Sequence, residues 1–83
     1  MKICNAIKKL EKAGFTASAA NTENRFSFTS PTGLHVVSFA ANHRSDSILC
    51  VKVRGAHDHD DWQQDYSAGV YVDTLSMAIR CAN

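Results

Sequence analysis

The chain has 83 residues, of which 45% are hydrophobic and 20% are charged. This length leaves room for one domain, residues 1–83, and the composition is that of a folded protein rather than a disordered one. The formal net charge of +1 does not mark the chain as a nucleic-acid binder. No apolar run is long enough for a signal-peptide core or a membrane span, so we expect a cytoplasmic protein.

The three cysteines, Cys4, Cys50 and Cys81, include no C-x-x-C pair. An odd and sparse set argues against a disulfide framework and suits a reducing compartment. Free cysteine is often buried, so we expect these three thiols to be free and buried in the interior.

Both ends of the chain have the periodicity of an amphipathic helix. In residues 2–13 apolar side chains recur at i, i+3, i+4 and i+7, and Gly14 follows as a helix C-terminal cap. The same spacing recurs in residues 75–82, where Asp73 or Thr74 can serve as the N-cap.

Between the helices, apolar and polar residues alternate in short runs separated by turn residues. The pattern predicts strands at residues 15–20, 25–30, 34–40, 48–54 and 69–72. In the fourth run Leu49, Val51 and Val53 alternate with Cys50, Lys52 and Arg54, which predicts one buried face and one cationic face.

The order of elements predicts an α+β fold in which four to five antiparallel strands form one sheet. The N-terminal and C-terminal helices should cover the same face of that sheet. The opposite face should be exposed to solvent, with Arg25, Ser27, Lys52 and Arg54 on it. The edge strands of so small a sheet also make a homodimer plausible.

The acidic segment, residues 57–66, follows the fourth predicted strand and reads H-D-H-D-D-W-Q-Q-D-Y. Its four aspartates have no Lys or Arg among them, and its two aromatic residues could anchor it on a partner. We hypothesise a non-enzymatic inhibitor that docks this segment on a basic nucleic-acid-binding surface of a larger host protein or nucleoprotein complex. The partner-binding residues would be Asp58, Asp60, Asp61, Trp62, Asp65 and Tyr66.

In its size, its α+β pattern and its lack of a catalytic motif, the chain resembles small phage and mobile-element inhibitors, including anti-CRISPR proteins. The resemblance implies nucleic-acid mimicry as the mechanism. It rests on no shared sequence motif.

A second hypothesis is a nucleic-acid-binding protein or ribonuclease. Its phosphate-binding residues would be Lys8, Lys9, Lys12, Lys52 and Arg54. The stretch I-K-K-L-E-K-A-G-F, residues 7–15, resembles the start of HicA-type toxins, which implies a double-stranded-RNA-binding-like fold and RNA cleavage. The Gly-Ser-His motif of that family is absent, so no catalytic residue is carried over and an enzyme is the less favoured reading.

A third hypothesis is a metal-binding protein. His57 and His59 point the same way in an extended segment, and imidazole with carboxylate suits zinc, iron or manganese. The ligands would be His57, His59 and either Asp61 or Asp65, with His43 as a further candidate. No cysteine lies near these residues, and we expect no cofactor.

Overall fold

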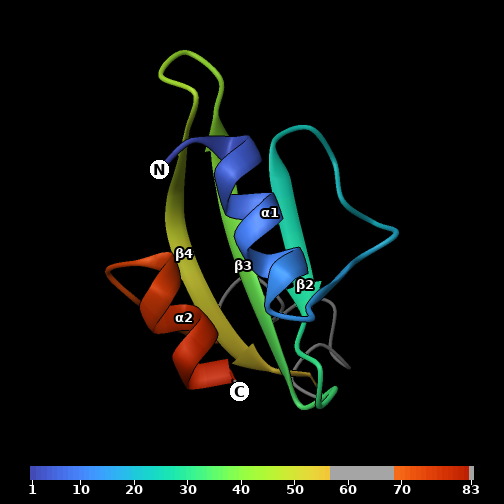
Figure 1. The fold of residues 1–83 in the computed structure, drawn as a ribbon. Helices are drawn as coiled ribbons and strands as arrows, with labels where there is room; N and C mark the ends of the chain where they lie inside the picture. The colour runs from blue at the N-terminus through green and yellow to red at the C-terminus, as the bar shows by residue number, and fades with distance from the viewer. Residues whose placement is uncertain (57–68, 83) are drawn as a thin grey trace.

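The computed structural model describes residues 1–56 and 69–82. Helix α1 (Ile3–Lys12) and helix α2 (Leu75–Ala82) lie on the same side of an antiparallel sheet (Figure 1). The strands lie in sequence order, each paired with the next, so the sheet is an open meander. The α+β prediction is confirmed. The strands are β1 (Thr16–Ala17), β2 (Arg25–Thr29), β3 (His35–Asn42), β4 (Ser47–Gly55) and β5 (Val70–Tyr71).

Helix α1 ends where the sequence predicts, at a glycine in the left-handed region. Gly14 has φ +90° and donates its N–H to the Glu11 carbonyl at 3.0 Å. The next residue, Phe15, donates its N–H to the Leu10 carbonyl at 3.0 Å, which completes a Schellman motif. Leu10 and Phe15 are both buried, so the same turn that ends the helix directs the chain into the core.

Helix α2 begins at a side-chain cap. The Met77 N–H donates to the Thr74 hydroxyl at 3.2 Å, the bond that an N-cap residue makes to the third helical position. Thr74 is therefore the N-cap, one of the two residues that the sequence allowed. Neither described helix is long and apolar enough to cross a membrane.

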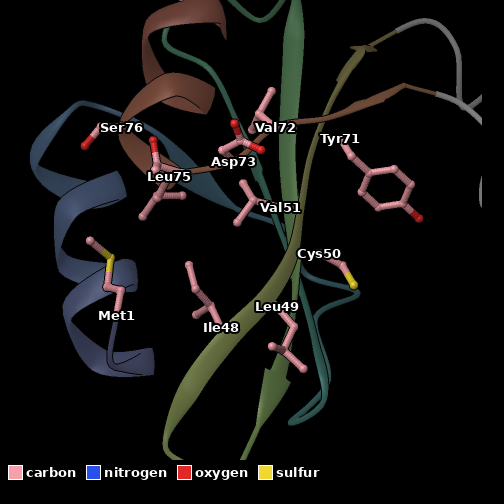
Figure 2. A pocket seen from close by; sticks show the side chains of 11 residues that line it. Met1, Ile48, Leu49, Cys50, Val51, Tyr71, Val72, Asp73, Leu75 and Ser76 are labelled. Atoms are coloured by element: carbon pink, nitrogen blue, oxygen red, sulfur yellow. The ribbon is translucent and has the colours of Figure 1, made fainter.

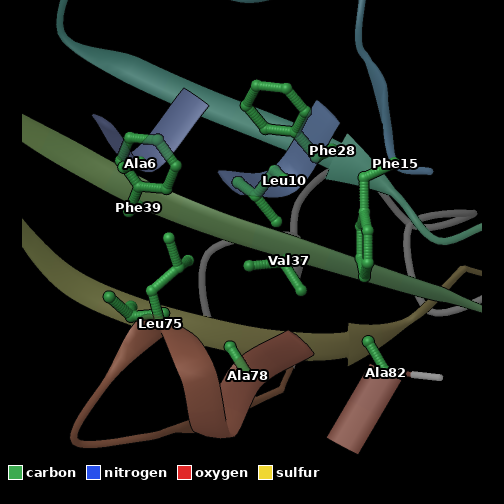
Figure 3. Packing of buried hydrophobic residues seen from close by; sticks show 10 residues of the cluster. Ala6, Leu10, Phe15, Phe28, Val37, Phe39, Leu75, Ala78 and Ala82 are labelled. Carbon is green, nitrogen blue, oxygen red and sulfur yellow. The ribbon is translucent and has the colours of Figure 1, made fainter. Parts of the chain in front are cut away.

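The hydrophobic core fills the space between the sheet and the two helices (Figure 3). The helices contribute small or branched side chains, and β2, β3 and β4 contribute aromatic and β-branched ones. The Phe26 and Phe39 rings stack with their centroids 5.3 Å apart, and Phe28 and Phe39 stack at 6.2 Å. Complete burial of one such side chain stabilises the fold by about 1.5–3 kcal/mol. The buried members are Ala6, Leu10, Phe15, Phe28, Val37, Phe39, Val51, Leu75, Ala78 and Ala82.

A β-bulge in β4 overturns part of the predicted alternation. Ser38 pairs with Lys52 and Ala40 pairs with Leu49, so two residues of β4 lie opposite Phe39 alone. Cys50 takes up the extra length with φ +55°. Because a shift of one residue moves the following side chains to the other face, Leu49 does not share the buried face of Val51. Leu49 is instead 45% exposed.

Strand β1 is shorter than the predicted strand at residues 15–20. After Ala17 the edge of β2 is bonded by a side chain: the Asn21 carboxamide accepts from the Ser27 N–H at 2.8 Å and donates to the Ser27 carbonyl at 3.2 Å. Of the two bonds that a longer β1 would make to Ser27, one remains, from the Ser18 N–H to the Ser27 carbonyl at 2.9 Å, and the asparagine takes over the other. The prediction of buried thiols is also wrong, since Cys4, Cys50 and Cys81 are free but exposed.

Candidate functional site

The acidic segment lies outside the described residues. So do all six of its predicted partner-binding residues and the predicted metal ligands His57, His59 and Asp61. The structure does describe the two points at which the chain enters and leaves residues 57–68. The Ala56 N–H donates to the Leu34 carbonyl at 2.9 Å, and a Cβ placed on Gly69 would lie 2.5 Å from the Val53 carbonyl oxygen. Both points are therefore held at the end of the sheet where β4 finishes.

Three cations lie on the open face of the sheet, by which we mean the face that neither helix covers. The strand register pairs Ser27 with Ser38 and Ser38 with Lys52 across β2, β3 and β4. These side chains lie on the opposite face of the sheet from the buried phenylalanines. Arg25 and Arg54 are each two residues from this row and share its face. The predicted position of these residues on the uncovered face is confirmed.

The cations line one groove of about 760 Å³ on this face. We call it the open-face groove. Residues with hydroxyl groups and the aromatic residue Tyr71 line the groove together with the cations. The charged, aromatic and hydroxyl-bearing residues that line the groove include Arg25, Lys52, Arg54, Tyr71, Ser18, Thr22, Ser27 and Ser38.

Lys52 and Tyr71 form the most closely defined pair in the groove. They are register partners across β4 and β5, and the Lys52 ammonium lies 5.1 Å from the centroid of the Tyr71 ring. Such a cation–π contact holds the two side chains in a fixed relation. Lys52 is only 9% exposed, which differs from the predicted solvent exposure, whereas Tyr71 is 66% exposed.

The groove cations also have interactions within the chain. Arg54 Nη1 donates to the Gly55 carbonyl at 3.4 Å, and Arg25, Lys52 and Arg54 each take part in at least one further interaction. An anion that binds in the groove has to share the cations with those contacts or displace them.

The structure separates the five predicted phosphate-binding residues into two groups. Helix α1 buries Ala6 and Leu10 on the opposite side of the sheet from the open face. Its lysines Lys8, Lys9 and Lys12 are exposed to solvent there, and Lys9 Nζ donates to the Ser76 hydroxyl of α2. A single ligand on the open-face groove therefore reaches Lys52 and Arg54 without reaching the α1 lysines.

A second cleft, of about 560 Å³, wraps around the edge of β4 (Figure 2). It is lined mainly by apolar side chains. Val51 and Ile48 point to the helix side of β4, while the Tyr71 ring extends on the other side. The Ile48 N–H on this edge donates to the Met1 carbonyl at 3.2 Å, so the start of the chain covers part of the strand edge.

The described histidines do not assemble a metal centre. His43 Nε2 is 2.7 Å from the Glu23 carbonyl oxygen, which ties this side chain to the turn before β2. His35, at the start of β3, has a buried Nδ1 with no hydrogen-bond partner in the described parts of the chain. Among residues 1–56 and 69–82, no three His, Cys, Asp or Glu side chains come together at metal-binding distance.

Six groove residues were missed as site residues. Arg25 and Ser27 were predicted to lie on the open face but not to bind a ligand, and Ser18, Thr22, Ser38 and Tyr71 were not considered. The alternation of residues in the predicted strand at 69–72 places Tyr71 on the opposite face from its apolar neighbours. This alternation is the sequence signal that could have identified Tyr71. Its pairing with Lys52 depends on the register between β4 and β5, which are joined through residues 57–68.

No protein-family model, curated protein or solved structure matches the chain. The resemblances to HicA-type toxins and to anti-CRISPR proteins therefore stay untested. The geometry of the open-face groove and the charge pattern of the sequence are the features that bear on function.

Proposed function

We propose that the chain is a non-enzymatic nucleic-acid-binding protein that holds the phosphate backbone in the open-face groove. The observation that carries this proposal is the convergence on one groove of Arg25 from β2 with Lys52 and Arg54 from β4. The bulk charge of +1 conceals this local concentration of cations. Phosphate contacts depend on such local charge, because neutralising phosphates releases condensed counterions.

The groove also supplies the other donors that phosphate uses. Ser18, Thr22, Ser27 and Ser38 bring hydroxyl groups to the same concave surface as the cations. Proteins bind phosphate oxygens mainly through Arg and Lys, and through Ser, Thr and Asn side chains. Guanidinium groups such as that of Arg54 can pair with phosphate in a bidentate manner.

The intramolecular interactions of the three cations lower the affinity that we expect for nucleic acid. Each of the three cations already takes part in an interaction within the chain, so a phosphate has to share that cation or displace its present partner. The net gain per contact is therefore smaller than for a preorganised and unpaired cation. We expect binding that is moderate in strength and that weakens as salt is added.

The test is the binding of a labelled single-stranded 12-nucleotide oligonucleotide, followed by fluorescence anisotropy. Replacing Arg25 and Arg54 by Gln should weaken binding by roughly tenfold or more, since tenfold is about 1.4 kcal/mol, the scale of one charge-assisted hydrogen bond. The matched control replaces Lys8 and Lys12 by Gln, which removes the same charge from the far side of the molecule. Equal losses in both double variants would mean that binding is not located in the groove.

The sequence favours a second candidate, which we also propose. The acidic segment carries four aspartates in eight residues together with Trp62 and Tyr66, a pattern suited to docking on a basic surface of a larger protein complex. By occupying such a surface, the chain would exclude nucleic acid from it. This is occlusion of the kind seen in nucleic-acid mimicry.

This candidate has its own variants. Changing Asp58, Asp60, Asp61 and Asp65 to Ser should abolish recovery of a protein partner from nuclease-treated lysate of the source cells. The matched control removes the same number of charges by changing the exposed acids Glu11, Glu23, Asp46 and Asp73 to Ser, and it should leave recovery unchanged. If recovery depends on nucleic acid and disappears after nuclease treatment, occlusion is wrong and the groove proposal gains support.

A further inference from the structure

We infer that the open-face groove selects single-stranded over double-stranded nucleic acid, and that Tyr71 is the residue on which a base stacks. This inference rests on the proposed function and specifies its ligand. It is carried by the exposed aromatic ring that stands beside the phosphate-binding cations.

The Tyr71 ring is available to a ligand. The residue is 66% exposed although it belongs to a strand that is paired with β4. Strand β5 is the last of the described strands, so no strand in the described part of the chain lies beyond the ring. In Figure 2 the ring extends away from Val51 and the other apolar side chains that point toward the helices. Packing in the hydrophobic core therefore does not hold the Tyr71 ring in place.

The ring is held instead by Lys52. The ammonium lies 5.1 Å from the ring centroid, and backbone pairing of Lys52 with Tyr71 fixes the relation of the two residues. A nucleotide has an anionic part and a flat aromatic part joined by a sugar. The Lys52 ammonium lies over one face of the Tyr71 ring, so a base would stack on the opposite face while the groove cations meet the phosphate.

This arrangement discriminates between the two forms of nucleic acid. Every base has a face that can stack on an aromatic side chain, but in a duplex those faces are already stacked on neighbouring bases. A duplex would therefore gain only the phosphate contacts of Arg25, Lys52 and Arg54. A single strand gains these and the Tyr71 stack as well, with little dependence on base identity.

The experiment measures the affinity of the intact chain for three labelled probes with the same number of phosphates per strand. The probes are a 12-nucleotide oligothymidine, its duplex with oligoadenine, and a 12-unit abasic strand that has the backbone without bases. The wild-type chain should bind the oligothymidine roughly tenfold more tightly than either other probe, the scale of one base-stacking interaction. The abasic probe separates stacking from backbone flexibility.

Two substitutions at one position locate the effect. Tyr71→Leu keeps an apolar side chain in β5 but removes the ring, and it should bring the oligothymidine affinity down to that of the abasic strand. Tyr71→Phe keeps the ring and should retain the preference.

Equal wild-type affinity for the oligothymidine and the abasic strand would overturn the stacking inference and leave the proposed function standing. Wild-type failure to bind any of the three probes would overturn the proposed function itself. Both results come from the unmodified chain, so they do not depend on whether a variant folds.

Discussion

Gly69 offers the sharpest test of how β5, and with it Tyr71, is positioned. Its φ is +96°, and a Cβ added there would lie 2.5 Å from the Val53 carbonyl oxygen and 2.9 Å from Arg54 Cβ. Gly33 provides the matched control: its φ is +76°, but a Cβ there would meet nothing within 4 Å. Replacing each glycine by alanine therefore separates backbone strain from steric conflict.

The expected loss of unfolding free energy in each alanine variant follows from these geometries. A left-handed alanine costs about 1–2 kcal/mol, partly offset by about 0.4–1 kcal/mol from the reduced freedom of the unfolded chain. Gly33→Ala should thus lower the free energy of unfolding by about 1 kcal/mol. Gly69→Ala adds overpacking against rigid backbone, about 1–3 kcal/mol, and should cost about 2–4 kcal/mol in total. A domain of this size has about 4–12 kcal/mol of stability, so Gly33→Ala should stay folded, whereas the larger loss at Gly69 would cancel the whole stability at the lower end of that range.

Urea unfolding followed by circular dichroism measures both losses, and an unchanged m-value shows that the comparison is valid. The expected difference of about 2 kcal/mol corresponds to a gap in melting temperature of about 8–16 °C. Because Gly69 lies two residues before Tyr71, Gly69→Ala should also weaken oligonucleotide binding, whereas Gly33→Ala should not. Equal stability of the two variants would refute the close approach of Gly69 to β4.

The remaining predictions concern the bulge, the α2 cap and the groove charges. Leu10→Ala should cost about 2–5 kcal/mol of unfolding free energy, while the same change at the half-exposed Leu49 should cost below about 1 kcal/mol; equal costs would contradict the β-bulge. Thr74→Ala should cost about 1 kcal/mol in thermal unfolding and Thr74→Ser much less; equal losses would mean that the hydroxyl does not cap α2. With three groove cations neutralising phosphates, oligonucleotide affinity should fall roughly twentyfold between 50 and 200 mM salt, from a slope of about 0.7 per contact. A salt-independent affinity would exclude phosphate binding in the groove.

The amino-acid sequence determined the elements of this protein and their order, because the deciding signals are local. The spacing of apolar residues defines α1 and α2, and Gly14 and Thr74 mark one end of each through bonds that span a few residues. The alternation in β2 and β3 likewise assigns Phe26, Phe28, Val37 and Phe39 to one face without reference to distant residues. Two one-sided helices flanking a run of strands then leave few ways to build the sheet.

The tertiary structure decided how those elements are aligned, because register depends on residues that are far apart in the chain. The bulge at Cys50 moves Leu49 out of the core and could not be read from an unbroken alternation. Asn21 accepts from the Ser27 N–H just beyond the end of β1, a contact between side chain and backbone that has no periodic signature.

The candidate site, too, could be predicted from the sequence only in part. The sequence identified the cations Lys52 and Arg54, but it joined them to the α1 lysines, which the sheet separates from them. Pairing of β5 with β4 brought Tyr71 beside Lys52 across a gap of 19 positions. Local periodicity specifies which face a side chain occupies; only the packing of strands and helices determines which other side chains share that face.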